Sequence, residues 1–284
     1  MLCSGASVAP RAAPATVILA LPSITSRRHP LVQACRDAKG GGPDEPLLLD
    51  GWHLLVDAVA AGLAVDAVAV NVDPPGPAEA RALDELIDGG AHAVHVTDDV
   101  LQAISPVRTS SGVVALARRP VLTLADVFVP APALVVVAVD VQDPGNVGAL
   151  VRTAEAAGAS GFVALGASAD PLGWKALRAS MGSAFRLPMA RVPDVAAFVA
   201  EARTREMQLV ALAARGGRAP EDVDLSRATC VFVGGEGPGL GASVLGEADQ
   251  VLTLPMAAPV ESLNVAVAGA LVVYAAAAQR RARV

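Results

Sequence analysis

The apolar run over residues 134–139 constrains the fold of this chain more than any other feature, because it contains no polar residue and leads directly into a turn and a helical pattern. A strand without polar alternation is typical of a parallel sheet whose two faces are both covered by helices. The helical pattern over 147–157 ends at Gly158, and a second apolar strand is expected over 161–165. The pattern therefore predicts a βαβ unit, in which the loop after the first strand is a common place for a ligand.

The chain of 284 residues divides into four segments. Residues 1–22 are rich in Ala, Pro and Ser, and we expect them to form a flexible tail. Short strands and helices alternate over residues 23–119 and predict a small α/β domain. A proline-rich linker is expected over 120–132, and a second α/β domain, doubly wound around the parallel sheet, over 133–284.

The composition argues against several classes of protein. A net charge of −6 disfavours broad, nonspecific binding of nucleic acid, although arginines cluster locally, as at Arg27 and Arg28. The 3 cysteines have neither metal-ligand nor disulfide spacing, so we expect no metal and a reducing, cytoplasmic environment. The longest late apolar run, over residues 265–278, is shorter than the roughly 20 residues that span a bilayer. No membrane segment is expected.

The loop over residues 254–264 ends in two small polar side chains, Ser262 and Asn264, where the last helical pattern begins. The first turn of a helix carries backbone N–H groups without intrahelical partners. Both side chains can cap these groups, and an ordinary helix cap is the simpler interpretation. The same end of the helix can also bind an anion or a ribose oxygen, which makes the loop a candidate ligand site.

Two further features suggest a ligand without identifying it. The glycine-rich segment over residues 234–240 follows an apolar strand, but its spacing matches neither the dinucleotide-binding fingerprint nor a Walker loop, which disfavours a nicotinamide-dependent enzyme. Arg152 lies inside the predicted helix that follows Asn146, and its guanidinium suits a phosphate or a polarised oxygen. Gly148, one turn before Arg152, would leave room for that ligand. A serine nucleophile is unsupported, because no histidine lies near Ser262 in the sequence.

Taken together, three separated segments resemble one family. Residues 143–154, 233–240 and 254–265 are similar, in order and spacing, to the three motifs of the SpoU (TrmH) family of RNA ribose 2′-O-methyltransferases, which belongs to the SPOUT superfamily. The first domain is similar to the family's N-terminal substrate-binding domain, which has an L30e-like fold. The residues that depart from the family pattern are His29, where Asn is common, Asp50, where Glu is usual, and Ala258, which replaces a frequent Gly.

The resemblance implies a fold and a set of site residues. It implies a C-terminal α/β domain with a parallel sheet and a deep trefoil knot, and a homodimer formed through that domain. The implied catalytic residues are Asn146, Arg152, Glu236, Ser262 and Asn264. The residues implied to contact the cofactor, S-adenosylmethionine, are Gly234, Leu254, Met256 and Leu263. The residues expected to face RNA are Arg27, Arg28, Arg178 and Ser180.

The resemblance also implies the chemistry. Because a guanidinium stays protonated, Arg152 is expected to hold the 2′-oxygen or an adjacent phosphate and to stabilise developing negative charge. Ser262 and Asn264 are expected to orient Arg152 and the ribose, and Glu236 to brace its loop. The expected partner is structured RNA, as 23S-type ribosomal RNA rather than transfer RNA. Two alternatives stay open: a noncatalytic RNA-binding relative and an antibiotic-resistance rRNA methyltransferase.

Overall fold

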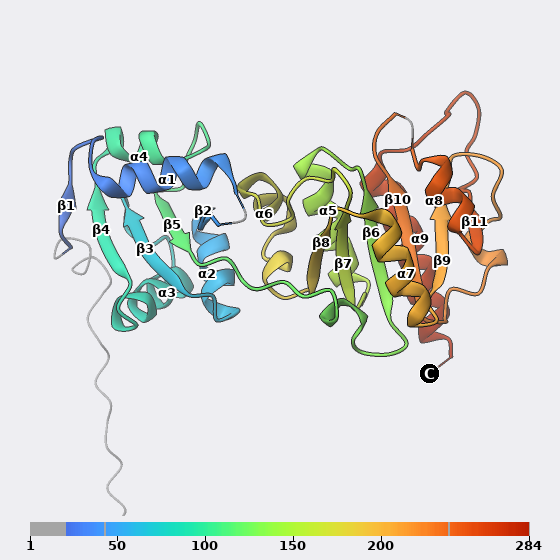
Figure 1. The fold of residues 1–284 in the computed structure, drawn as a ribbon. Helices are drawn as coiled ribbons and strands as arrows, with labels where there is room; N and C mark the ends of the chain where they lie inside the picture. Colours follow the sequence, from blue (N-terminus) through green and yellow to red (C-terminus); the bar gives the residue numbers. More distant parts are fainter. Residues whose placement is uncertain (1–20, 43, 238, 284) are drawn as a thin grey trace, which may run out of the picture.

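Two α/β units lie side by side along the long axis of the molecule (Figure 1). The structure, a computed structural model, describes residues 21–42, 44–237 and 239–283. The tail expected over 1–22 therefore lies, apart from its last residues, outside the described ranges. None of the helices within those ranges is both long enough and apolar enough to cross a membrane.

The first unit carries a mixed sheet covered by helices on both faces. Its elements are β1 (Ser23–Ile24), α1 (Pro30–Gly40), β2 (Leu47–Asp50), α2 (Trp52–Ala60), β3 (Val65–Val70), α3 (Pro77–Asp88), β4 (His92–Val96), α4 (Asp98–Ile104) and β5 (Val113–Ala117). The strand order is β1-β4-β3-β5-β2, with β5 antiparallel to both of its neighbours. Buried side chains of α2 and α3 pack on one face of the sheet, and those of α1 and α4 pack on the other.

The second unit carries a parallel sheet in the order β11-β9-β10-β6-β7-β8. Its elements are β6 (Leu134–Val139), α5 (Pro144–Ala156), β7 (Gly161–Leu165), α6 (Trp174–Ser180), β8 (Met189–Val192), α7 (Val195–Thr204), β9 (Gln208–Leu212), β10 (Thr229–Gly234), α8 (Ala242–Glu247), β11 (Gln250–Leu252) and α9 (Val265–Arg281). The expected α/β class and the parallel second sheet are confirmed. The threading of a trefoil knot and the L30e likeness of the first unit stay predictions of the resemblance.

Both faces of the second sheet are buried, as the apolar run over residues 134–139 predicts. Leu134 packs in the cluster beneath α5 and α9, whereas its neighbour Val135 packs in the cluster beneath α7. One expected strand is displaced. The strand predicted around 186–189 begins at its last residue, Met189, because the preceding residues form a helical turn in which the N–H of Leu187 donates to the carbonyl of Ser183 at 3.0 Å.

Part of the linker expected over 120–132 packs into the second unit. Val127 lies in a short 3-10 helix (Asp126–Phe128) and is fully buried, and its carbonyl oxygen accepts a hydrogen bond from Oγ of Ser160 at 2.8 Å. Gly161 leaves the space that Val127 fills, because a Cβ on this glycine would lie 2.4 Å from the Cβ of Val127. The prolines of the segment predict a loop but do not reveal this apolar anchor within it.

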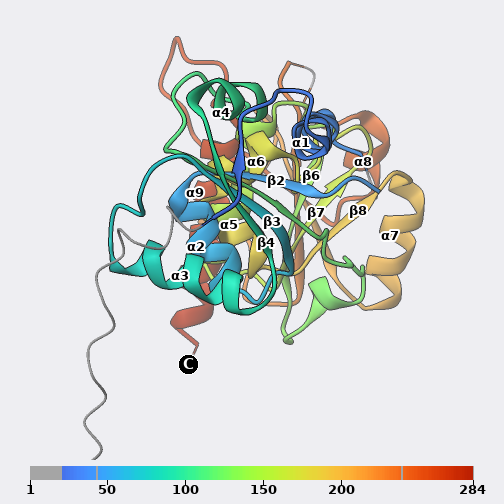
Figure 2. The same ribbon diagram turned by 90° about the vertical axis from the view of Figure 1, so that its left-hand side faces the viewer.

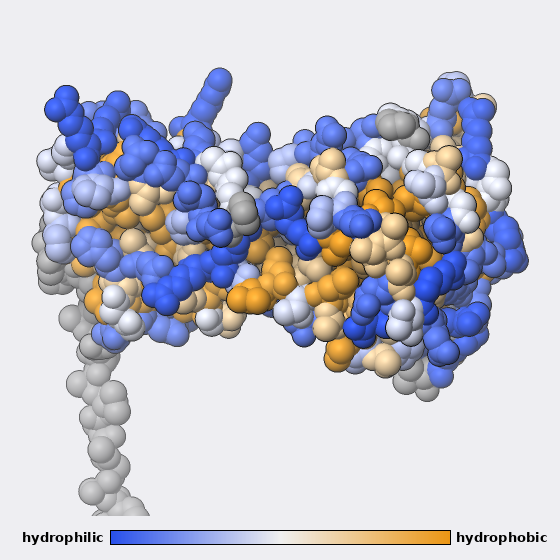
Figure 3. Space-filling model, in the orientation of Figure 1, coloured by the Kyte–Doolittle hydropathy of each residue, from blue (hydrophilic) through white to orange (hydrophobic). Residues whose placement is uncertain are grey.

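Ion pairs hold the two units together. Arg119 pairs with Asp170 at 2.9 Å, and both side chains are largely buried. Arg186 lies 3.6 Å from Asp57 of α2 and 2.7 Å from Glu155 of α5. The first unit stands in front of the second when the molecule is viewed along its long axis (Figure 2). Hydrophobic residues reach the surface near the waist between the units (Figure 3).

Candidate active site

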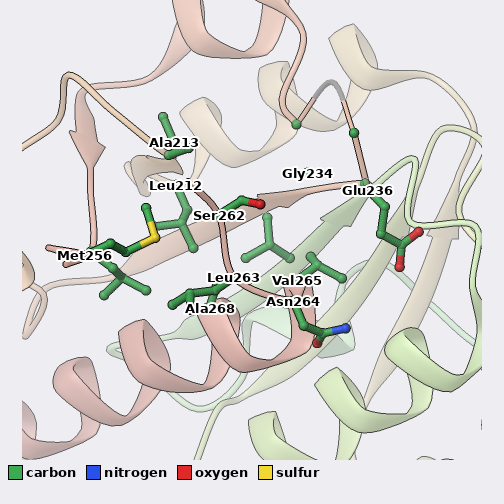
Figure 4. A pocket seen from close by; sticks show the side chains of 16 residues that line it. Leu212, Ala213, Gly234, Glu236, Met256, Ser262, Leu263, Asn264, Val265 and Ala268 are labelled. Carbon is green, nitrogen blue, oxygen red and sulfur yellow. The ribbon is translucent and has the colours of Figure 1, made fainter. Parts of the chain in front are cut away.

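A cavity of about 400 Å³ opens at the carboxyl ends of β9 and β10 (Figure 4). Ligand sites of α/β proteins lie at this edge of the sheet, and their volumes run from about 300 to 1,000 Å³. Three stretches of chain form the wall: the end of β9, the end of β10 with the glycine-rich loop that follows it, and the loop over residues 254–264 with the first turn of α9. Its apolar side chains include Leu212, Val233, Leu254, Met256, Leu263 and Ala268.

Asn264 is the N-cap residue directly before α9. Its Oδ1 accepts hydrogen bonds from the backbone N–H groups of Ala266 at 2.9 Å and Val267 at 3.2 Å. The cap expected from the sequence is therefore confirmed. The same side chain lines the cavity, and its Nδ2 donates to Oδ1 of Asn146 at 3.0 Å. Asn264 is both a helix cap and part of the cavity rim.

Asn146 connects the loop after β6 to the glycine-rich loop after β10. Its Nδ2 donates to Oε1 of Glu236, so Asn264, Asn146 and Glu236 form a chain of side-chain hydrogen bonds. Asp143 positions Asn146 by capping α5, since Oδ1 of Asp143 accepts from the backbone N–H of Asn146 at 2.8 Å. Polar side chains from three distant motifs thus meet at one rim.

The loops after β6 and β10 pack so closely that Gly235 has no room for a side chain. A Cβ on Gly235 would lie 2.3 Å from the carbonyl oxygen of Asp140. Asp140 has a left-handed backbone, with φ at 54°, and its Oδ1 accepts a hydrogen bond from the N–H of Ala167 at 2.7 Å. The N–H of Gly235 in turn donates to the carbonyl of Val139 at 2.9 Å. At this position the glycine allows two loops of the site to touch.

The cavity brings together most of the residues expected at the site. All four residues expected to contact the cofactor line it: Gly234, Leu254, Met256 and Leu263. Three of the expected catalytic residues line it as well: Glu236, Ser262 and Asn264. Residues 212–214, at the end of β9, also line the cavity and are not among the residues expected from the sequence. They could have been predicted, because the carboxyl ends of parallel strands lie at the same edge of a sheet.

Two expected catalytic residues, Asn146 and Arg152, are absent from the cavity wall. Asn146 is joined to the wall by its hydrogen bonds with Glu236 and Asn264, whereas Arg152 has no such link among the hydrogen bonds of the described residues. The side chain of Arg152 is exposed on α5. The expectation of open space beside Gly148 was wrong. A Cβ on Gly148 would lie 2.3 Å from the carbonyl oxygen of Ala176 on α6, so this glycine allows α5 and α6 to pack closely and leaves no room for a ligand.

The residues expected to face RNA differ in exposure. Arg28 and Arg178 are exposed, and Arg27 is exposed but tied to Asp99, whose backbone carbonyl accepts from its Nε at 3.0 Å. Ser180 is fully buried, and its Oγ donates to a carbonyl of its own helix at 2.9 Å. The RNA contact expected of Ser180 was therefore wrong, because this face of α6 is turned into the protein.

The fold and the cavity define a class of protein, an α/β protein with a cavity of ligand size at the carboxyl edge of a parallel sheet. The chain belongs to the SpoU rRNA methylase family, for which the family model matches residues 133–274. That range runs from the start of β6 into α9 and contains the whole cavity wall. The resemblance seen in three segments of the sequence is confirmed.

Similar proteins cover most of the chain. An uncharacterised tRNA/rRNA methyltransferase of Synechocystis sp. is 34% identical over 267 residues, which are 91% of this chain and 94% of that protein. The 23S rRNA (guanosine(2553)-2′-O)-methyltransferase RlmP of Bacillus subtilis is 30% identical, over 80% of this chain and 86% of its own length. The crystal structure of an AdoMet-bound rRNA methyltransferase from Sinorhizobium meliloti has a TM-score of 0.80 and 26% identity, and the match covers 92% of this chain and 98% of that one.

Proposed function

We propose that this protein transfers a methyl group from S-adenosylmethionine to the 2′-oxygen of a ribose in structured RNA. The observation that carries the proposal is the meeting of three loops at one cavity, tied together by Asn264, Asn146 and Glu236. Membership of the SpoU family supports the reaction. The Bacillus subtilis relative is named as an enzyme that methylates the 2′-oxygen of a guanosine in 23S rRNA.

The cavity suits a nucleoside cofactor. Apolar side chains form one part of its wall, and the polar side chains of Ser262, Glu236 and Asn264 lie on another (Figure 4). Gly234 presents only backbone, since a Cβ there would lie 2.3 Å from the backbone of Gly239. The Sinorhizobium meliloti relative with a similar fold is AdoMet bound. We assign the apolar contacts of the cofactor to Leu254, Met256 and Leu263, and backbone contacts to Gly234.

The chain's own residues divide the catalytic work. When bound, the cofactor supplies a methyl group on a positively charged sulfur, and transfer requires a 2′-oxygen that is held in position and has lost its proton. Glu236, braced by Asn146, and Asn264 form the rim that positions the ribose. Ser262 orients the same ribose from the facing loop. The guanidinium of Arg152 binds the adjacent phosphate, where it offsets the negative charge that develops on the oxygen.

We assign ribosomal RNA of the 23S type as the substrate. Two of the similar proteins are named as rRNA methyltransferases, one of them for a guanosine of 23S rRNA. The first unit supports this assignment, because it adds an α/β body with exposed arginines such as Arg28 beside the catalytic unit. A large structured RNA has the extent to contact both units, and phosphate contacts by arginine position a protein on RNA.

We also propose that two copies of the chain pair through α9. Val267, Leu271 and Tyr274 recur at helical spacing on one face and are 50%, 50% and 47% exposed. Grouped apolar side chains on a surface mark an interface, and a twofold axis lets such a stripe pack against its own copy. Leu271→Asp should convert a dimer to a monomer in sedimentation, whereas Val121→Asp, at a 90% exposed position, should not. A monomeric parent protein would contradict the pairing.

A methylation assay tests the function. The purified protein is incubated with tritiated S-adenosylmethionine and either ribosomal or transfer RNA taken from cells that lack the gene. We expect tritium to be incorporated into ribosomal RNA only. Mass spectrometry of the digested RNA should then identify a single 2′-O-methylated nucleoside. Calorimetry on the same preparation measures cofactor binding. Cofactor binding without transfer to any RNA would indicate a noncatalytic relative, and absence of cofactor binding would exclude the proposal.

A further inference from the structure

A second cavity, of about 320 Å³, lies between the two units. It is open on one side and is lined by the end of β2, the start of α2, the segment that leads from Pro75 into α3, the loop before β5, and α6 with the Met181 that follows it. α6 packs on α5, and α5 packs on α9, which borders the first cavity. A helix with its side chains is about 10 Å across. A nucleotide whose ribose reaches the first cavity therefore cannot place its own base in the second, so any ligand there is a separate group.

Asp50 gives this cavity a hydrogen-bond acceptor that the described protein does not satisfy. The residue is only 8% exposed, and its Oδ2 accepts from Oγ of Ser105 at 2.6 Å. Its Oδ1 has no hydrogen-bond donor among the described residues, although Asp50 lines the cavity. Burial raises the pKa of Asp50, while the Ser105 hydrogen bond and the charge of Arg178 oppose that rise. Oδ1 of Asp50 is not one of the fully enclosed unpaired side-chain atoms among the described residues, so solvent reaches it from the cavity, and a ligand with N–H groups can take the place of that water.

The remaining lining shows what kind of ligand fits. Apolar side chains supply walls for a flat ring: Trp52, Leu54, Pro75 and Met181. The charged side chains of the lining are three carboxylates, Asp50, Asp57 and Glu79, against one guanidinium, that of Arg178, with the imidazole of His53 beside them. The excess of carboxylates disfavours a phosphate in this space. A metal ion is not supported either, because within the described ranges no three His, Cys, Asp or Glu side chains are placed to hold one. Apolar walls with an acceptor for N–H groups match an unstacked nucleobase.

We propose that the interdomain cavity binds an unpaired guanine of the RNA substrate, in a nucleotide other than the one that is methylated. Guanine carries two neighbouring donors on its Watson–Crick edge, N1–H and the N2 amine, which can meet the two oxygens of one carboxylate. Each carboxylate oxygen has two acceptor sites, so Oδ2 of Asp50 can serve the guanine as well as Ser105. Adenine and the pyrimidines lack this pair of adjacent donors. The proposal rests on the action on RNA proposed above, and it adds a base-specific anchor.

Short RNAs test the cavity without knowledge of the natural substrate. The probes are fluorescein-labelled nonamers of uridine whose central nucleotide is uridine, adenosine, guanosine or inosine, and binding to the full chain is measured by anisotropy. We expect the guanosine probe to bind about tenfold more tightly than the all-uridine probe, which corresponds to about 1.4 kcal/mol. Inosine keeps N1–H but lacks the N2 amine, so its probe should bind with intermediate affinity. Equal affinities for all four probes would overturn the inference.

Substitutions in the cavity test whether the preference for guanosine arises there. Asp50→Asn places an amide N–H against the guanine donors and should reduce the ratio of guanosine to uridine affinity to about one. Thr109→Trp, on an exposed loop that lines the cavity, should do the same by filling it, and it tests the site even if the Asp50 variant does not fold. Asp88→Asn, at the exposed end of α3, is the matched control and should keep the preference. A preference that survives both cavity variants would place the guanine elsewhere.

The outcomes separate this inference from the proposed function. Calorimetry with S-adenosylmethionine and methylation of ribosomal RNA are measured on the same preparations. Methylation without any guanosine preference would remove the guanine anchor and leave the enzyme as proposed. A guanosine preference in a protein that methylates no RNA would keep the anchor and remove the proposed reaction.

Discussion

Nδ2 of Asn264 lies 3.0 Å from Oδ1 of Asn146, although the two residues are 118 positions apart in the chain. Oδ1 of the same Asn264 accepts the first free N–H groups of α9. One side chain therefore starts the last helix and joins it to the loop that carries Asn146. The side-chain oxygen of Asn264 stabilises the helix, and the side-chain nitrogen connects the helix to the cavity rim. Substitutions can therefore distinguish the two roles.

Asn264→Asp should keep the cap and lose the bond to Asn146. A carboxylate oxygen caps a helix about as well as an amide oxygen, so we expect a free energy of unfolding within about 0.5 kcal/mol of the parent. Methyl transfer should fall at least about tenfold, because the donor to Asn146 becomes a second acceptor. Asn264→Ala should lose transfer and about 1 kcal/mol of stability. Urea denaturation and turnover on the same samples measure both effects, and full turnover by the Asp variant would contradict the role given to this bond.

Arg152→Ala should reduce methyl transfer by about 100-fold, the usual loss when a group that stabilises transition-state charge is removed. The melting temperature should not change, because the side chain is exposed on α5. Arg152→Lys keeps the charge without the forked donors and should retain intermediate activity. Arg191→Ala, at an exposed position of β8, is the control for loss of a surface arginine and should be fully active. Near-normal turnover by Arg152→Ala on the cognate RNA would exclude the role.

The sequence predicts the features that depend on neighbouring residues in the chain, such as the burial of a strand or the cap of a helix. The apolar residues of β6 could only be buried on both faces, and Asn264 precedes an apolar helix, so the sheet and the cap followed from the sequence. Ser180 and Gly148 could not be placed in this way. Which face of α6 is buried depends on its packing against α5, and no spacing within either helix specifies the partner. The exposed position of Arg152 outside the cavity wall could not be predicted for the same reason.

Gly148→Ala should destabilise the second unit. The added Cβ would lie 2.3 Å from the carbonyl oxygen of Ala176 and 2.6 Å from the Cβ of Ala179, so α6 must shift away from α5. Overpacking of this kind costs about 1–3 kcal/mol. Gly246→Ala is the matched control, because nothing lies within 4 Å of its added Cβ on α8 and alanine favours a helix over glycine by about 0.5–1 kcal/mol. Thermal and urea unfolding should move in opposite directions for the two variants, and equal stabilities would contradict the close contact.

The ion pair between Arg186 and Glu155 should make stability depend on pH. Nε and Nη2 of Arg186 donate to the two oxygens of Glu155 at 2.7 and 2.9 Å. The hydrogen bond from Arg186 holds the pKa of Glu155 below its ordinary value of 4.5. The unfolded chain therefore takes up this proton more readily than the folded protein. The stabilisation is fully present above pH 4.5 and is lost as the pH falls through the lower pKa of the folded state.

Glu155→Gln isolates this contribution from the other carboxylates. Asp57, which also faces Arg186, has a pKa that burial raises, so its own effect on stability runs in the opposite direction with pH. The difference in free energy of unfolding between the parent and Glu155→Gln removes effects common to both. We expect that difference to be largest at neutral pH and to shrink as the pH falls below 4.5. Glu201→Gln breaks an exposed pair between α7 and Arg205, the residue directly after that helix, and should cost little, because solvent screens the pair. A parent-minus-Glu155→Gln difference that stays constant from neutral to acid pH would show that Arg186 does not hold Glu155 in its charged form.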